Sequence, residues 1–86
     1  MGQIQLNHSR HGWALLAMRL PEIRVLAGKS MLDEICESYS QVSLYLGKLS
    51  AANAPVEEIR DYEALRDSIE MEAEYFASVV DEVAAA

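Results

Sequence analysis

Two histidines near the start of this 86-residue chain have the spacing of a pair of metal ligands. His8 and His11 are three residues apart, which places both side chains on the same side of a helix. A structural zinc site has four protein ligands, and a catalytic zinc site has three protein ligands and a water molecule. The sequence has one cysteine and no third histidine. We therefore expect no metal site here, only two solvated histidines.

The other reactive side chains do not form a catalytic pattern. Cys36 has Glu34 and Glu37 as neighbours, and carboxylates raise the pKa of a thiol rather than lower it. Together with Glu70 and Glu74 these acids lack the Glu-x-x-His motif of di-iron bundles. The glycines are scattered and form no phosphate-binding loop. We expect a protein that is not an enzyme and that needs no cofactor.

One enzymatic alternative stays open. A small helical enzyme acting on an anionic metabolite requires cationic side chains that converge in space, as in chorismate mutases. Arg19, Arg24 and Lys48 are the residues that would have to meet.

Composition and charge narrow the class of protein further. Hydrophobic residues make up 51% of the chain, too many for a disordered protein. The net charge is −7, and it is unevenly distributed. Residues 1–30 have a net charge of +3, whereas residues 31–86 have a net charge of −10. Such an acidic surface repels phosphate backbones, so we expect no direct binding of nucleic acid.

The sequence predicts a cytoplasmic protein. No stretch approaches the roughly 20 apolar residues that cross a bilayer, so we expect no membrane span. No secretory signal is recognisable at the N-terminus. A single cysteine cannot form an internal disulfide, which is typical of a reducing compartment.

Prolines and glycines divide the chain, a single domain over residues 1–86, into three helical segments. We expect a short helix over about 9–19, with Ser9 as its N-cap, and a break at the Leu20-Pro21 step. A long helix follows over about 21–49, with a possible break at 28–30, where Ser30 resembles an N-cap. A second long helix runs over about 55–84, starting from Pro55.

Apolar residues at helical spacing predict how the long helices pair. The first long helix has an apolar seam with steps of three and four residues, made of Leu32, Ile35, Tyr39, Val42, Leu46 and Leu49. The last helix has a main apolar stripe made of Ile59, Tyr62, Leu65, Ile69, Ala73, Phe76, Val80 and Val83. We expect an all-α fold, an antiparallel hairpin of two long helices with a short N-terminal helix, which dimerises into a helical bundle.

The last helix carries more than this one stripe. At about 100° per residue, a charged face lies beside the stripe, made of Glu63, Arg66, Asp67, Glu70, Glu74 and Asp81. Beyond it lies a second apolar strip, made of Ala64, Met71, Tyr75 and Val79. One partner helix cannot cover both apolar surfaces. The second strip must meet the N-terminal helix (through Trp13, Leu16 and Leu20), a second copy of the chain, or a different protein.

A short motif in the last helix resembles a known family. Ser68-Ile69-Glu70-Met71-Glu72-Ala73 is similar to the Ser-Ile-Glu-Met-x-Ala stretch of the TraM family of quorum-sensing antiactivators, and Leu20-Pro21 resembles the step that opens their first long helix. The chain departs from the family pattern at Glu72, where the family has histidine, and in its shorter inter-helix linker. The resemblance implies a dimeric helical hairpin that binds a LuxR-type transcription activator and prevents DNA binding, without a cofactor.

These observations together predict a small acidic regulator that acts by binding another protein. The expected partner-binding residues are Met71, Tyr75, Val79, Glu63, Asp67, Glu70 and Glu74. The alternative function is a secretion or assembly chaperone or adaptor. In that case the same second strip binds an exported or structural protein.

Overall fold

The chain is all-α over the range that the computed structural model describes, residues 7–28 and 30–85. Helix α1 spans His8–Arg19, and two short 3₁₀ segments follow, η1 over Pro21–Leu26 and η2 over Ser30–Leu32. Two longer helices complete the chain, α2 over Asp33–Ala51 and α3 over Val56–Ala85. The predicted fold class is therefore confirmed at the level of all-helical structure.

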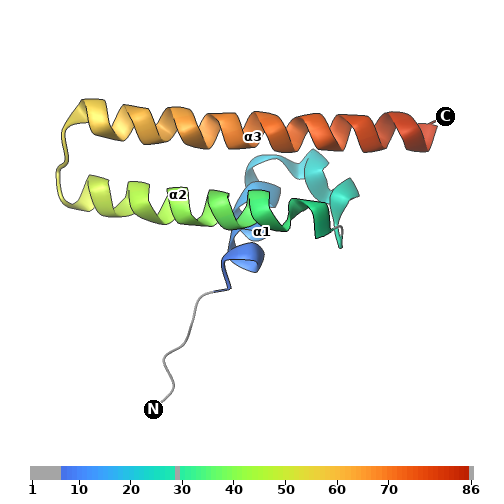
Figure 1. The fold of residues 1–86 in the computed structure, drawn as a ribbon, viewed down its shortest axis with the longest axis horizontal. Coiled ribbons are helices and arrows are strands. Elements are labelled where there is room, and N and C mark those ends of the chain that lie inside the picture. The colour runs from blue at the N-terminus through green and yellow to red at the C-terminus, as the bar shows by residue number, and fades with distance from the viewer. Residues whose placement is uncertain (1–6, 29, 86) are drawn as a thin grey trace, which may run out of the picture.

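Helices α2 and α3 lie side by side and run in opposite directions, while α1 packs across α2 (Figure 1). Asn53, in the turn between α2 and α3, has a φ of 53°. Asparagine tolerates this left-handed conformation better than most residues. The amide of Ala54 donates to the carbonyl oxygen of Leu49 at 3.0 Å, which satisfies one of the last free carbonyls of α2.

The N-cap of α1 lies two residues earlier than predicted. The side chain of Asn7, not that of Ser9, accepts a hydrogen bond from the backbone amide of Arg10, at 3.1 Å. The prediction of Ser9 as the N-cap is wrong because Asn7 caps equally well and stands at the right position. Ser9 lies inside the helix, where its hydroxyl donates to Asp33 Oδ1 of α2 at 3.3 Å.

The segment predicted as one long helix over 21–49 is divided in the structure. Pro21 opens η1, which ends at Leu26, and Gly28 turns the chain with a φ of +78°. The possible break at 28–30 is therefore a true break, and a continuous helix over 21–49 is wrong. Ser30 does not cap α2, because the N-cap position is held by Leu32 without a side-chain hydrogen bond.

The break lets the N-terminal third contribute to the core. Ile23 and Leu26 of η1 and Leu16 of α1 are fully or almost fully buried. They pack in one cluster with residues of the two long helices, namely Leu32, Ile35, Cys36, Tyr39, Ile69, Ala73 and Ala77. The small side chains of Ala73 and Ala77 leave room for η1 to lie against α3. The apolar seam predicted for the α2 region is buried or half-buried throughout.

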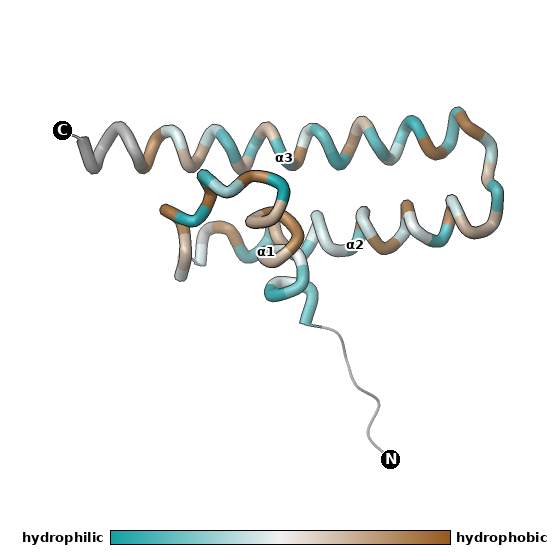
Figure 2. Tube along the Cα trace, turned by 180° about the vertical axis from the view of Figure 1, so that it is seen from behind, coloured by the Kyte–Doolittle hydropathy of each residue, from teal (hydrophilic) through white to brown (hydrophobic). Residues whose placement is uncertain are grey.

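The buried face of α3 is rotated relative to the predicted stripe. Ala77 is buried although it lies outside that stripe, whereas Leu65 belongs to it and is exposed. Figure 2 shows apolar residues alternating with hydrophilic ones along α3. The rotation arises because η1 as well as α2 packs against α3. Val83 and Asp81 lie beyond the residues whose side chains are described.

Helices α1 and α2 lie in close contact at Gly12. A Cβ atom built on Gly12 would lie 1.7 Å from the carbonyl oxygen of Cys36, far inside van der Waals contact. The backbones of the two helices therefore touch at this point, and only glycine fits there.

Within the described part of the chain, no helix has the length and apolar character to cross a bilayer.

Candidate protein-binding surface on the last helix

The second apolar strip of α3 is uncovered. Met71 is 69% exposed, Tyr75 is 65% exposed and Val79 is 37% exposed, and Ala64 is exposed as well. We call these four residues the outer strip. The ring of Tyr75 packs edge-on against Phe76, with 5.9 Å between the ring centroids, which restricts its orientation.

The N-terminal helix is not the element that covers this strip. Leu16 is fully buried, and it packs in the cluster that contains Ile69 and Ala73 on another face of α3. Trp13 and Leu20 are half-buried against the same cluster. The alternative in which these residues fold over the outer strip is therefore wrong.

Carboxylates border the outer strip. Asp67 and Glu74 are exposed and Glu63 is half-buried, and we call these three residues the acidic rim. Asp67 lies 3.9 Å from the Nε of Arg66, which is a weak ion pair beyond hydrogen-bonding distance. Asp81, predicted on the same face, lies beyond the described side chains.

A shallow groove extends the acidic surface toward η1. Its volume is about 490 Å³, and it is lined by Glu22, Val25, Glu74, Ala77 and Ser78. Neither Glu22 nor Glu74 forms an ion pair with any described side chain. Ser78 follows Glu74 by four residues and Tyr75 by three, so the groove adjoins the outer strip on the helix surface. Glu22 was missed in the sequence because it stands in the basic N-terminal third.

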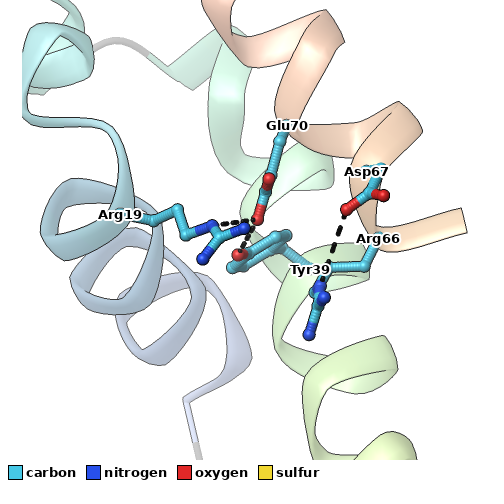
Figure 3. A network of polar contacts seen from close by, with 5 residues as sticks. All are labelled: Arg19, Tyr39, Arg66, Asp67 and Glu70. Atoms are coloured by element: carbon cyan, nitrogen blue, oxygen red, sulfur yellow. Dashed lines mark hydrogen bonds and ion pairs between the residues drawn. The ribbon is translucent and has the colours of Figure 1, made fainter. Parts of the chain in front are cut away.

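Glu70 does not belong to the acidic rim, and its predicted place on an outer charged face is wrong. The residue is 9% exposed and lies between α1 and α2 (Figure 3). Its Oε2 atom accepts a hydrogen bond from the hydroxyl of Tyr39 at 2.6 Å. The same atom forms an ion pair with the Nε of Arg19 at 3.2 Å. A buried carboxylate is stable only with such partners. Glu70 therefore joins the helices to one another.

The contact with Glu70 also perturbs the pKa of Tyr39. Burial of the ring and the hydrogen bond to the Glu70 carboxylate raise the pKa of Tyr39 to about 12, against the smaller opposing effect of Arg66 and Arg19. The phenol stays protonated at all physiological pH values and acts as a donor.

The three cations proposed for an anionic metabolite are not the ones that meet. Arg19 lines a pocket together with Arg66, and neither Arg24 nor Lys48 takes part in it. Lys48 lies nine residues after Tyr39 on α2, roughly 13 Å along the helix axis. This pairing could not be predicted from the sequence, because the helical period places Arg66 on a charged outer face of the last helix.

The two histidines have a structural contact. The Nδ1 atoms of His8 and His11 lie 2.8 Å and 2.7 Å from the Oγ of Ser40, a fully buried residue of α2. The expectation of two solvated histidines is therefore wrong. A hydroxyl can donate to one acceptor and accept from another donor, so both contacts can be satisfied together. No group of three or more potential metal ligands occurs among the described residues.

Cys36 is a buried part of the core. Burial, with a smaller effect of the Asp33 carboxylate, raises the pKa of its thiol. The direction agrees with the prediction, although the acid responsible is Asp33 rather than Glu34 or Glu37. A protonated, buried thiol is a poor nucleophile.

Comparison with known proteins identifies no relative: no protein-family model, no curated protein and no solved structure matches this chain.

Proposed function

We propose that this chain is a non-enzymatic protein-binding module, which uses the outer strip and the acidic rim of α3 to bind a basic surface of another protein. The observation that carries the proposal is the exposure of Met71, Tyr75 and Val79 beside the carboxylates of Glu63 and Glu74, which form no ion pair with any described side chain. Exposed apolar surface bordered by polar residues is typical of interaction sites.

The two parts of the surface have different physical roles. Burying the apolar side chains of the outer strip supplies most of the affinity, about 25 cal/mol for each Å² removed from water. Tyrosine is also a common anchor at the centre of protein interfaces. The acidic rim speeds the encounter with a positively charged partner and disfavours acidic ones.

A basic DNA-binding protein is the partner that this surface favours. The acidic rim and the groove at Glu22 and Glu74 would compete with DNA phosphates for the same basic residues of the partner. We infer an antiactivator-like regulator, acting on an activator such as one of the LuxR type, which the resemblance of residues 68–73 to the TraM family also suggests.

A second copy of the chain is the other candidate for covering the outer strip. It would form a homodimeric bundle of the antiparallel α2–α3 hairpin. Pairing two outer strips would bring two surfaces bordered by carboxylates together, and like charges oppose that pairing. A basic partner avoids this repulsion.

A DNA-release assay tests the proposal. A LuxR-type activator is bound to fluorescently labelled DNA, and anisotropy is measured as the chain is added. We expect the wild-type chain to release the DNA and the double variant Met71→Glu with Tyr75→Ala to fail. Met18→Glu is the matched control, because Met18 is also highly exposed but lies on α1. Equal release by the wild type and the double variant would show that the surface assignment is wrong.

Light scattering of the same proteins over a hundredfold concentration range measures their mass in solution and so tests for the homodimer. A wild-type dimer that the double variant converts to a monomer would assign the outer strip to self-association. The acidic rim would then be the remaining surface for a partner.

A further inference from the structure

A second pocket lies where the three α-helices meet. Its volume is about 340 Å³, and it is lined by Leu15, Met18, Arg19, Tyr39, Ser43 and Arg66. Figure 3 shows that Arg19 comes from α1, Tyr39 from α2 and Arg66 from α3. Two guanidinium groups and two hydroxyls therefore line one small, open pocket on the surface, and none of these residues belongs to the outer strip or the acidic rim.

The polar groups of this pocket are incompletely satisfied. The Nε of Arg66 is buried and has no hydrogen-bond partner in the described structure. The carboxylate of Asp67 is 3.9 Å away and mostly exposed to solvent, so it does not replace a hydrogen bond. A buried N–H group without an acceptor is rare in proteins and is unfavourable unless another molecule supplies the acceptor.

Arg19 also has donors to spare. Its Nε faces Glu70, while the side chain remains 59% exposed. A guanidinium has five N–H groups, so one contact leaves the others free. Among the described residues, Glu70 is the carboxylate buried at this junction, and its Oε2 atom pairs with the Nε of Arg19. The pocket itself is lined by two arginines and by no carboxylate, in a protein that is strongly acidic overall.

We propose that this pocket binds a small organic anion, a carboxylate or a phosphate monoester. The anionic oxygens would accept hydrogen bonds from Arg66 and Arg19 and from the hydroxyl of Ser43. Leu15 and Met18 supply an apolar wall for the remainder of the molecule. Arginine suits this task because its planar donors match carboxylate and phosphate oxygens.

Binding at this place has a structural consequence. The arginines belong to α1 and α3, so an anion between them ties the short helix to the long ones. The ligand binds the folded chain and not the unfolded one, and it therefore raises the temperature of unfolding.

The test uses phenyl phosphate and benzoate as probes, with benzyl alcohol as a neutral control, all at constant ionic strength. The thermal midpoint and the NMR signal of the Arg66 Nε–H group are followed during titration. We expect both anions to raise the midpoint and to shift the Arg66 signal to saturation at millimolar concentration, while benzyl alcohol changes neither. The probe that binds more tightly distinguishes a phosphate ligand from a carboxylate ligand.

Arg66→Gln and Arg60→Gln form a matched pair of variants. Both remove one positive charge from α3, but Arg60 is exposed and does not line the pocket. We expect Arg66→Gln to weaken binding of the anion about tenfold or more, as a lost charge-assisted contact does, and Arg60→Gln to leave it unchanged. An equal loss in both variants, or a wild-type Arg66 signal that does not move with either anion, would overturn the proposal. The NMR titration of the wild-type chain does not depend on the folding of any variant.

Discussion

Replacing Gly12 by alanine tests the close contact between the backbones of α1 and α2. Alanine normally stabilises a helix relative to glycine by about 1 kcal/mol. At Gly12 we expect the opposite sign, because the added Cβ would lie 1.7 Å from the carbonyl oxygen of Cys36 and 2.5 Å from its carbonyl carbon. Both are backbone atoms, which cannot move aside as a flexible side chain does.

The size of the effect follows from the distance that α1 must move. Ordinary contact begins at 3.4 Å, so α1 has to retreat by roughly 1.7 Å from α2. The hydrogen bonds from His8 and His11 to Ser40, now 2.8 Å and 2.7 Å long, would be lost by such a movement. Overpacking costs about 1–3 kcal/mol and each hydrogen bond about 1 kcal/mol. After the gain in helix propensity is subtracted, we expect a net loss of about 2–4 kcal/mol.

Gly47 provides the control within the same protein. It lies inside α2, four residues before the end of the helix, it is exposed, and a Cβ there would meet nothing within 4 Å. Gly47→Ala should therefore stabilise the chain by about 0.5–1 kcal/mol. Gly28→Ala also has open space, but the φ of +78° makes it destabilising by about 1 kcal/mol.

Thermal unfolding followed by circular dichroism measures all three variants. For a domain of this size, each kcal/mol corresponds to a shift in Tm of about 4–8 °C, so the order of the variants is easily resolved. If Gly12→Ala proved as stable as Gly47→Ala, the close crossing of α1 and α2 would be refuted.

Three further predictions concern the buried polar groups. The pKa of Tyr39 is about 12 in the folded chain and about 10 in the unfolded one. The protonated phenol of Tyr39 therefore stabilises the folded chain fully below pH 10, and the free energy of unfolding falls by about 3 kcal/mol as the pH rises to 12. Alkaline urea titrations should show this loss in the wild type and not in Tyr39→Phe. Ser40→Ala removes the contact of His8 and His11, so calorimetry should show a destabilisation of about 1–2 kcal/mol. Cys36 is buried, so a thiol reagent should react with it at the rate of unfolding rather than at once, and immediate labelling of the native chain would contradict this placement.

Several features of the fold could be predicted because local chemistry determines them. The break after Leu20 follows from the geometry of Pro21, and the seam from Leu32 to Leu49 follows from the helical period. The existence of a second apolar strip on α3 is also a local property, because it follows from the helical period, whereas the sequence left open what covers it. Helix content, element order and the existence of an unpaired apolar face are consequences of such short-range rules.

The contacts between distant segments could not be predicted in this way. The helical period places Glu70 and Arg66 beside the main stripe, but it does not say that Tyr39 and Arg19 will lie against them. Gly12 reads as a weak point in a helix until Cys36 of another helix fills the space of its missing side chain. The helical period shows how polar and apolar residues are arranged around the axis of one helix. Which face is buried, which charges are paired and where a pocket forms depend on how the elements cross, because that geometry is set by packing among residues far apart in the chain.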